Sequence, residues 1–90
     1  MSGLAGKKRY LVLAMRTPHF SDEVIARHVA FLDALRSEGK LEMTGGFSDG
    51  SGGAYVLLVG SLEEAQALAG ADPLATSDAS VLTVYEWNTR

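Results

Sequence analysis

The chain has 90 residues, a net charge of −3 and 47% hydrophobic residues, and it contains no cysteine. This length fits one domain with a thin core, and the composition is typical of a folded globular protein. The lack of cysteine excludes disulfide bonds, thiolate zinc sites and a cysteine nucleophile, and the acidic balance disfavours a nucleic-acid partner, which would need a basic face.

Residues 1–8 are interpreted as a flexible leader and residues 9–90 as a single domain. Residues 9–16 form an apolar stretch of strand length with an arginine at each end, and its alternate side chains are apolar on both faces. We therefore expect this strand to be covered on both sides. The apolar run is too short for a secretory signal or a membrane span, so we expect a cytoplasmic protein without membrane contact.

A helix is predicted after Thr17-Pro18, with Ser21 as its N-cap and Gly39 at its end. At roughly 100° per residue, His28 lies in the middle of the apolar stripe of this helix. The apolar side chains within roughly 60° of it are Val24, Ile25, Phe31, Leu32 and Leu35. An imidazole in such a stripe needs a hydrogen-bond partner or a cavity.

Residues 41–47 alternate in polarity, which predicts an edge strand with Leu41 and Met43 on one face and Glu42 and Thr44 on the other. The glycine-rich segment 45–53 is interpreted as a flexible hairpin loop. It is unlike a phosphate-binding loop, because it lacks the Walker lysine and leads into a strand.

Residues 54–59 are again apolar on both faces, as expected for a central strand. Ser61 and Glu64 have the spacing of a capping box, which predicts a short helix that ends near Gly70. A turn at Asp72-Pro73 and a last strand over residues 80–87 complete the chain.

The element order βαββαβ predicts an α+β fold of the ferredoxin-like type, a four-stranded antiparallel sheet with two helices on one face. The first and third strands would lie in the centre, in agreement with their two apolar faces. Because helices cover only one face, the other would stay exposed. We therefore expect a homodimer that buries the helix-free face, giving a dimeric α/β barrel.

His28 and Asp72 are the candidate acid/base pair, because the topology brings the turn after the second helix towards the first helix. A carboxylate there would orient the ring and stabilise its protonated form. Two simpler interpretations stay open. His28 can be a core histidine with one hydrogen bond, and Asp72 can cap its own turn. His19, Asp22 and His28 match no known ligand spacing, so no metal is expected. No cofactor motif occurs, so no cofactor is expected.

The chain resembles the YCII-related family of small dimeric α/β-barrel proteins from Arg9 to about Trp87. The segments that carry the resemblance are residues 27–32, 38–41, 45–46, 61–68 and 71–74. The resemblance implies a His–Asp pair in a pocket, here His28 and Asp72. Tyr55 and Ser77 are weaker candidates for binding the substrate.

Relatives of this family include muconolactone isomerase-like proteins and a dehydrochlorinase acting on a chlorinated hydroxyquinol. The resemblance therefore implies a cofactor-free lyase, isomerase or dehydrohalogenase acting on a small metabolite. Two alternatives stay open. One is a non-catalytic module that binds or senses a small metabolite in the same pocket, and the other is a structural dimerisation domain with a vestigial site.

Overall fold

The structure, a computed structural model, describes residues 6–90, so most of the expected leader lies outside the described residues. Lys8 already belongs to the first strand, one residue earlier than expected. The elements in chain order are β1 (Lys8–Arg16), α1 (Glu23–Ser37), β2 (Leu41–Gly46), β3 (Gly52–Val59), α2 (Leu62–Ala71), α3 (Pro73–Thr76) and β4 (Ser80–Trp87).

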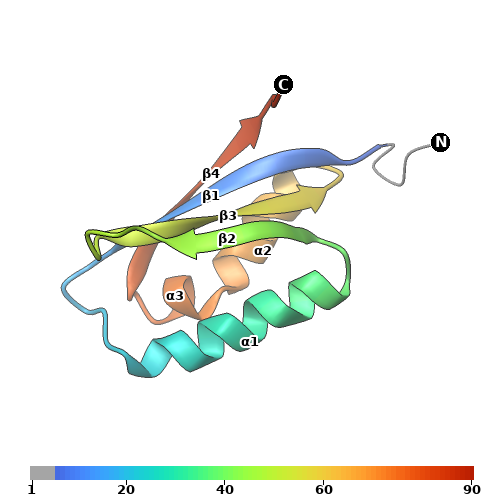
Figure 1. Ribbon diagram of the computed structural model, residues 1–90. Coiled ribbons are helices and arrows are strands. Elements are labelled where there is room, and N and C mark those ends of the chain that lie inside the picture. Colours follow the sequence, from blue (N-terminus) through green and yellow to red (C-terminus); the bar gives the residue numbers. More distant parts are fainter. Residues whose placement is uncertain (1–5) are drawn as a thin grey trace.

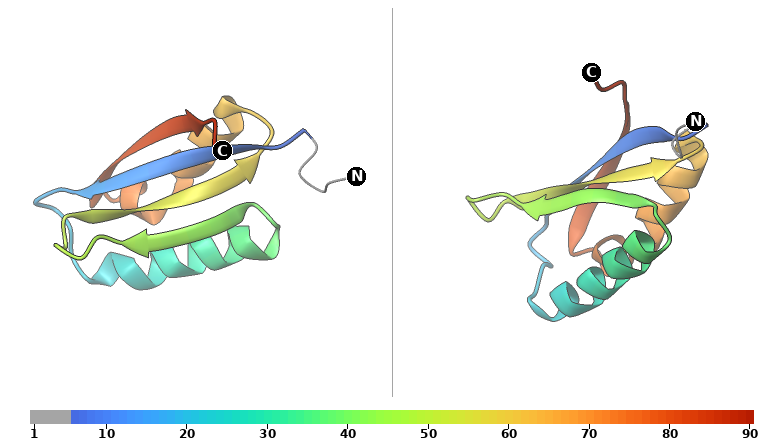
Figure 2. Two further views of the ribbon diagram at one scale, coloured as in Figure 1. Left: turned by 45° about the horizontal axis from the view of Figure 1, so that its top comes forward. Right: turned by 45° about the vertical axis from the view of Figure 1, so that its right-hand side comes forward.

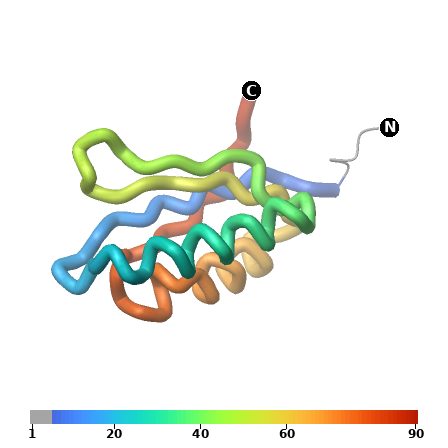
Figure 3. The backbone as a smooth tube through the Cα atoms, turned by 60° about the horizontal axis from the view of Figure 1, so that its bottom comes forward, coloured from blue at the N-terminus to red at the C-terminus, as the bar shows by residue number. Residues whose placement is uncertain are grey.

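The four strands form one antiparallel sheet in the order β2-β3-β1-β4. The predicted ferredoxin-like topology is confirmed, with β1 and β3 in the centre and β2 at an edge. All three helices lie on one face of the sheet (Figure 1, Figure 2). Figure 3 shows α1 beside the α2–α3 segment from the helix side. None of the helices in residues 6–90 is long and apolar enough to cross a membrane.

The core lies between the sheet and the helices. Alternate residues of the central strands point towards the helices and are buried, and Leu32 and Leu35 of α1 pack onto them. The buried residues of β1 and β3 in this core are Tyr10, Val12, Tyr55, Leu57 and Val59, and Leu41 of β2 joins them. The two-residue alternation of the strands therefore assigns each side chain to a face, as the sequence pattern predicted.

The helix ends differ slightly from expectation. Helix α1 begins after Asp22, whose side chain makes no capping hydrogen bond, so the expected N-cap at Ser21 is wrong by one residue. Gly39 follows the helix with a backbone φ of 73°, and its N–H donates to the carbonyl of Arg36. Ser61 caps α2 as expected, since its Oγ accepts a hydrogen bond of 3.1 Å from the Glu64 N–H. The second bond of the capping box is displaced by one residue, because the Glu64 carboxylate accepts from the Gly60 N–H at 3.4 Å.

A β-bulge in β2 corrects the face assignment of that strand. Leu41 lies opposite Leu57 on the helix side, whereas Met43 lies opposite Val56 on the other face. The prediction that Leu41 and Met43 share a face is therefore wrong, because a bulge adds one residue and reverses the alternation after it. The bulge also places Thr44 on the helix side, where it lines a pocket.

Part of the glycine-rich segment that was expected to be a loop belongs to the strands of the hairpin. Its strands continue to Gly46 and resume at Gly52, and the Phe47 N–H donates to the Gly52 carbonyl at 2.8 Å. A Cβ on Gly53 would collide with the backbone carbonyl of Gly45. Glycine at this position therefore permits a close approach of β2 and β3.

The helix-free face of the sheet exposes large apolar side chains. They belong to three different strands, and the register places them on the same side as Leu11 and Leu13. The exposed members are Met15, Met43, Val81, Tyr85 and Trp87. This face is the apolar surface that the sequence pattern predicted for a monomer.

Candidate functional site

Asp72 stands between two helices, as the last residue before α3 and the first after α2. Pro73 occupies the first position of α3, and Asp72 Oδ1 accepts a hydrogen bond of 2.9 Å from the Leu74 N–H. The local capping role expected of an Asp-Pro turn is therefore present. The residue is nevertheless 0% exposed, which is unusual for an aspartate in a turn.

The buried carboxylate contacts two further side chains. His28 Nδ1 lies 2.9 Å from Asp72 Oδ1, and the Tyr55 hydroxyl donates to Asp72 Oδ2 at 2.9 Å. The His28 side chain is 19% exposed, so the ring is neither fully buried nor free in solvent. Helix α1, strand β3 and the α2–α3 turn thus bring three polar side chains to one point, and both oxygens of the carboxylate have partners.

The Tyr55 hydroxyl stays protonated and donates a hydrogen bond to the Asp72 carboxylate. Burial raises the pKa of the Tyr55 hydroxyl, and the neighbouring Asp72 carboxylate raises it further. The hydroxyl therefore keeps its proton at every pH near neutrality and donates it to the carboxylate. Tyr55 also lies beside the imidazole, with the two ring centroids 6.0 Å apart. These contacts of Tyr55 restrict the positions of the Asp72 carboxylate and the His28 ring.

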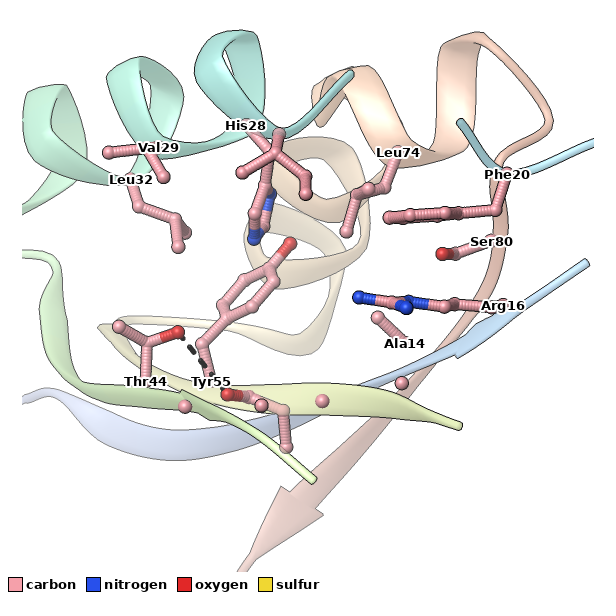
Figure 4. A pocket seen from close by; sticks show the side chains of 16 residues that line it. Ala14, Arg16, Phe20, His28, Val29, Leu32, Thr44, Tyr55, Leu74 and Ser80 are labelled. Atoms are coloured by element: carbon pink, nitrogen blue, oxygen red, sulfur yellow. Dashed lines mark hydrogen bonds between the residues drawn. The ribbon is translucent and has the colours of Figure 1, made fainter. Parts of the chain in front are cut away.

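The contact with Asp72 assigns the roles of the two His28 nitrogens. A carboxylate oxygen accepts hydrogen bonds, so the proton of a neutral ring is placed on Nδ1. Nε2 then carries a lone pair and is the nitrogen available to a bound molecule. The ring lines a pocket of about 270 Å³, and Figure 4 shows it projecting from α1 towards Tyr55.

The pocket lies between α1 and the ends of β2 and β3 that form the hairpin. Ile25, Val29 and Leu32 of α1 supply an apolar wall, and hairpin glycines from both strands expose backbone on the opposite side. Thr44 lines the pocket as well, with its hydroxyl donating to the Ala54 carbonyl at 3.3 Å. The cavity is therefore mostly apolar, with a few polar groups at defined places, as in many small-molecule sites.

A positive charge lies at another side of the pocket. The Arg16 guanidinium sits 3.9 Å from the centre of the Phe20 ring, and both side chains line the cavity. Figure 4 shows the two stacked and pointing towards the space beside Tyr55. Ser80, the residue opposite Arg16 on β4, completes this side.

The structure brings together three of the four candidate residues. His28, Asp72 and Tyr55 are in contact, whereas Ser77 is not brought to this pocket. Its hydroxyl donates to the Pro73 carbonyl at 2.6 Å and closes α3, which uses its hydrogen-bonding capacity locally. Ser77 is not among the residues that line the pocket. Within residues 6–90, no group of three His, Asp or Glu side chains is placed to hold a metal ion.

Sequence reasoning missed four polar or aromatic residues of the pocket, namely Arg16, Phe20, Thr44 and Ser80. A usable signal existed for Arg16, because it ends a central strand and precedes a short loop into the helix that carries His28. The alternation of β2 did not indicate Thr44, because the bulge reverses the faces after it. Phe20 had no signal, since its position depends on how the loop after β1 folds back.

Comparison with known proteins places the chain in a family. The model of the YCII-related domain matches residues 8–88. The chain is also 53% identical over 78 residues to the uncharacterised protein YjpA of Bacillus subtilis (strain 168), a match that covers 87% of this chain and 92% of that protein.

Two solved structures are similar to this chain at low sequence identity. One is a 5-chloro-2-hydroxyhydroquinone dehydrochlorinase from Burkholderia phenoliruptrix AC1100, in complex with 2,5-dihydroxybenzoquinone. It is 18% identical, with a TM-score of 0.68 over 91% of this chain and 95% of that chain. The other is a hydroxynitrile lyase from Passiflora edulis, 16% identical with a TM-score of 0.49 over 93% and 95%. The likeness to the dehydrochlorinase shows a common fold.

Proposed function

The chain belongs to the YCII-related family, and we propose that it is a cofactor-free enzyme acting on a small molecule, of the lyase, isomerase or dehydrohalogenase type. His28 is its general acid and base, and Asp72 is the residue that positions His28. The observation that carries the proposal is the 2.9 Å contact between His28 Nδ1 and a fully buried carboxylate, at the wall of a pocket.

The geometry supports proton transfer at Nε2. The Nε2 lone pair takes a proton from a carbon or hydroxyl group of the bound molecule, and the electron pair of the broken bond stays on that molecule. The imidazolium that forms is stabilised by the Asp72 carboxylate at Nδ1. Tyr55 and the Leu74 N–H hold that carboxylate in place, so it needs no rearrangement when the charge develops.

The fate of the electron pair decides the type of reaction. In an isomerase the same proton returns from Nε2 to another atom of the substrate. In a lyase or dehydrohalogenase the electron pair forms a double bond, and a leaving group departs with its own bonding electrons. Support for the second type comes from the dehydrochlorinase of the same fold, whose structure holds a dihydroxybenzoquinone.

Binding without turnover is the second candidate function. Its support is the scarcity of reactive groups, because the pocket lining contains no carboxylate and its other side chains are largely apolar. A small metabolite could be held there through His28 and Tyr55 without chemical change. Such a module would sense or carry the metabolite.

We also propose that the protein is a homodimer that buries the helix-free face. The support is the row of exposed apolar side chains on this face, among them Val81 at 63% exposure and Trp87 at 48%. The charges of Arg9 and Glu42 on this face neutralise each other in a direct ion pair of 2.7 Å. A second copy would meet an apolar surface without net repulsion from this pair.

Carbon–hydrogen exchange tests the proposed chemistry without knowledge of the natural substrate. The probes are α-angelica lactone, whose proton beside the carbonyl is acidic, and 5-chloro-2-hydroxyhydroquinone. In D₂O, proton NMR follows deuterium incorporation and migration of the lactone double bond, and a chloride electrode follows release from the second probe. We expect catalysis of one of these reactions, reduced about 10²–10⁴-fold in His28→Asn.

The matched control is His19→Asn, which removes the other histidine, in the exposed loop before α1. It should leave the rates unchanged. Equal rates in the wild type and His28→Asn would contradict the proposed acid/base role. Binding of the probes without any reaction would favour the second candidate function.

A further inference from the structure

Arg16 is the charged group of the pocket that the proton-transfer scheme does not use. It is the last residue of β1, and its backbone N–H donates to the Ser51 carbonyl at 3.0 Å, which fixes the start of the side chain. The Phe20 ring, 3.9 Å from the guanidinium carbon, limits the side chain further through a cation–π contact. The planar guanidinium is thus held with its edge towards the cavity (Figure 4).

No carboxylate of the described residues pairs with this guanidinium. The ion pairs of residues 6–90 use other cations, namely Lys8, Arg9, Lys40 and the His28 ring. The pocket lining contains neither aspartate nor glutamate, and the nearby Asp72 is fully buried with both oxygens engaged. An arginine without a counterion, at a mostly apolar cavity of an acidic protein, is suited to an anionic ligand.

The shape of the pocket limits the size of that ligand. Its volume of about 270 Å³ is below the range of roughly 300–1,000 Å³ that is usual for drug-sized ligands. One wall consists of apolar side chains of α1, and the facing hairpin carries glycines without side chains. These surfaces favour a single flat ring.

We propose that Arg16 binds an anionic oxygen of the substrate, which is a small planar molecule carrying a phenolate, enolate or carboxylate group. This inference rests on the proposed function only in placing the reacting atom at His28, on another side of the same pocket. Arg16 would bind and orient the substrate. The two free N–H edges of its guanidinium would favour an anionic oxygen group that lies in a plane over a neutral group.

Calorimetric titration with two matched quinones tests this assignment. The first, 2,5-dihydroxybenzoquinone, is anionic at neutral pH, and the second, 2,5-dimethylbenzoquinone, is neutral and nearly isosteric, with a methyl group in place of each hydroxyl. We expect the wild type to bind the anion at least about tenfold more tightly than the neutral quinone. Arg16→Gln should remove this preference, while Arg16→Lys, which keeps the charge but loses the planar fork, should retain part of it.

Arg27→Gln is the matched control, since Arg27 is an exposed arginine of α1 outside the pocket lining. It should bind both quinones as the wild type does. The proposal is overturned by equal affinity of the wild type for both quinones, by no measurable affinity for the anion, or by an Arg16→Gln variant that retains the preference. Thermal unfolding followed by circular dichroism verifies that each variant is folded.

The same titration with His28→Asn separates this proposal from the proposed function. An anion preference that survives in His28→Asn supports the role of Arg16 whether or not proton transfer occurs. Conversely, lactone exchange that requires His28, together with equal affinity of the wild type for the two quinones, supports the enzyme and overturns the anion site.

Discussion

The two faces of the sheet depart from the usual burial pattern in opposite ways. On the helix-covered face, Asp72 and Tyr55 are polar groups within a buried layer, and every one of their hydrogen-bonding side-chain atoms has a partner. On the helix-free face, Val81 and Trp87 are apolar groups exposed to solvent. Neither arrangement is the one that stability alone would favour, because polar groups are normally exposed and apolar ones buried.

This contrast indicates different tasks for the two faces. A polar cluster in the core is costly unless it is fully hydrogen-bonded, so its presence beside a pocket points to chemistry or binding. An exposed apolar sheet face points to association with another surface. The two tasks are separable, because a change on one face should leave the function of the other face intact.

The largest effect is expected from Asp72→Ala. This change removes the acceptor of three donors, the Leu74 N–H, the Tyr55 hydroxyl and His28 Nδ1–H. Each buried donor left without a partner costs about 1–3 kcal/mol, so we expect unfolding free energy to fall by about 3 kcal/mol or more. Urea unfolding followed by circular dichroism measures this loss.

Asp72→Asn serves as the matched control for Asp72→Ala. It keeps an oxygen for the Leu74 N–H but removes the charge that stabilises a protonated His28. It should therefore retain more stability than Asp72→Ala and still lose most of the exchange activity. A loss below about 1 kcal/mol in Asp72→Ala would show that the cluster is not essential to the fold.

The next effect concerns the helix-free face. Val81→Glu places a charge on the proposed interface, where burial of an unpaired carboxylate is unfavourable. Sedimentation equilibrium at micromolar concentration should give twice the chain mass of 9.5 kDa for the wild type and the single chain mass for the variant. The quinone affinity of the folded variant should change little, because Val81 is not among the residues that line the pocket.

Leu62→Glu is the control for this prediction, because Leu62 is an exposed apolar residue at the start of α2, on the helix layer. It should leave the dimer intact. If the wild type sediments as a monomer, the homodimer proposal is wrong and the exposed apolar face has no explanation.

A smaller effect is expected from Tyr55→Phe, and it depends on pH. The pKa of Tyr55 is raised in the folded protein by burial and by the Asp72 carboxylate, whereas an unfolded tyrosine ionises near pH 10. The contribution of the protonated Tyr55 hydroxyl to the free energy of unfolding is therefore fully present below about pH 10. It is lost as pH rises further, because only the unfolded chain releases this proton there.

Melting curves from pH 8 to 11 measure this dependence. The melting temperature of the wild type should fall above about pH 10, and that of Tyr55→Phe should fall less steeply, from a lower starting value. Tyr10 also has a raised pKa because of its burial, so part of the decline should persist in the variant. Parallel curves for the two proteins would contradict the role of Tyr55 as a buried donor.

The fold could be predicted from the sequence because its strongest signals were local and repeated. Two strands with apolar faces on both sides had to be central, and a capping box marked the start of α2. The contact between His28 and Asp72 followed from similar reasoning, since a histidine in an apolar stripe needs a partner that the topology can supply.

The remaining features depend on contacts that no local pattern encodes. A bulge at Glu42 inserts one residue without changing the composition of the strand, so the alternation alone placed Met43 on the wrong face. The stacking of Arg16 on Phe20 depends on the path of the loop between β1 and α1. The sequence does not distinguish Ser77 from other hydroxyl residues near the site, because its hydrogen bond to the Pro73 carbonyl depends on how the turn folds.

The smallest effect is expected from Glu42→Gln, which removes the charge of Glu42 from an ion pair on the helix-free face. Two hydrogen bonds join the Glu42 carboxylate to the Arg9 guanidinium across the helix-free face, at 2.7 and 2.8 Å. The bond from Arg9 holds the pKa of Glu42 below its usual value. The pair therefore stabilises the fold above the normal pKa of glutamate, and this contribution is lost as pH falls through the lowered value.

Melting curves of wild type and Glu42→Gln at several pH values and salt concentrations check this expectation. The melting temperature of the variant should be slightly lower at pH 7, and the difference should vanish in acid. Because the proposed dimer covers this pair, the difference at pH 7 should persist in high salt. A difference that shrinks in high salt would show that the pair is exposed to solvent. The salt dependence of this one ion pair thus reports on whether a second subunit covers the helix-free face.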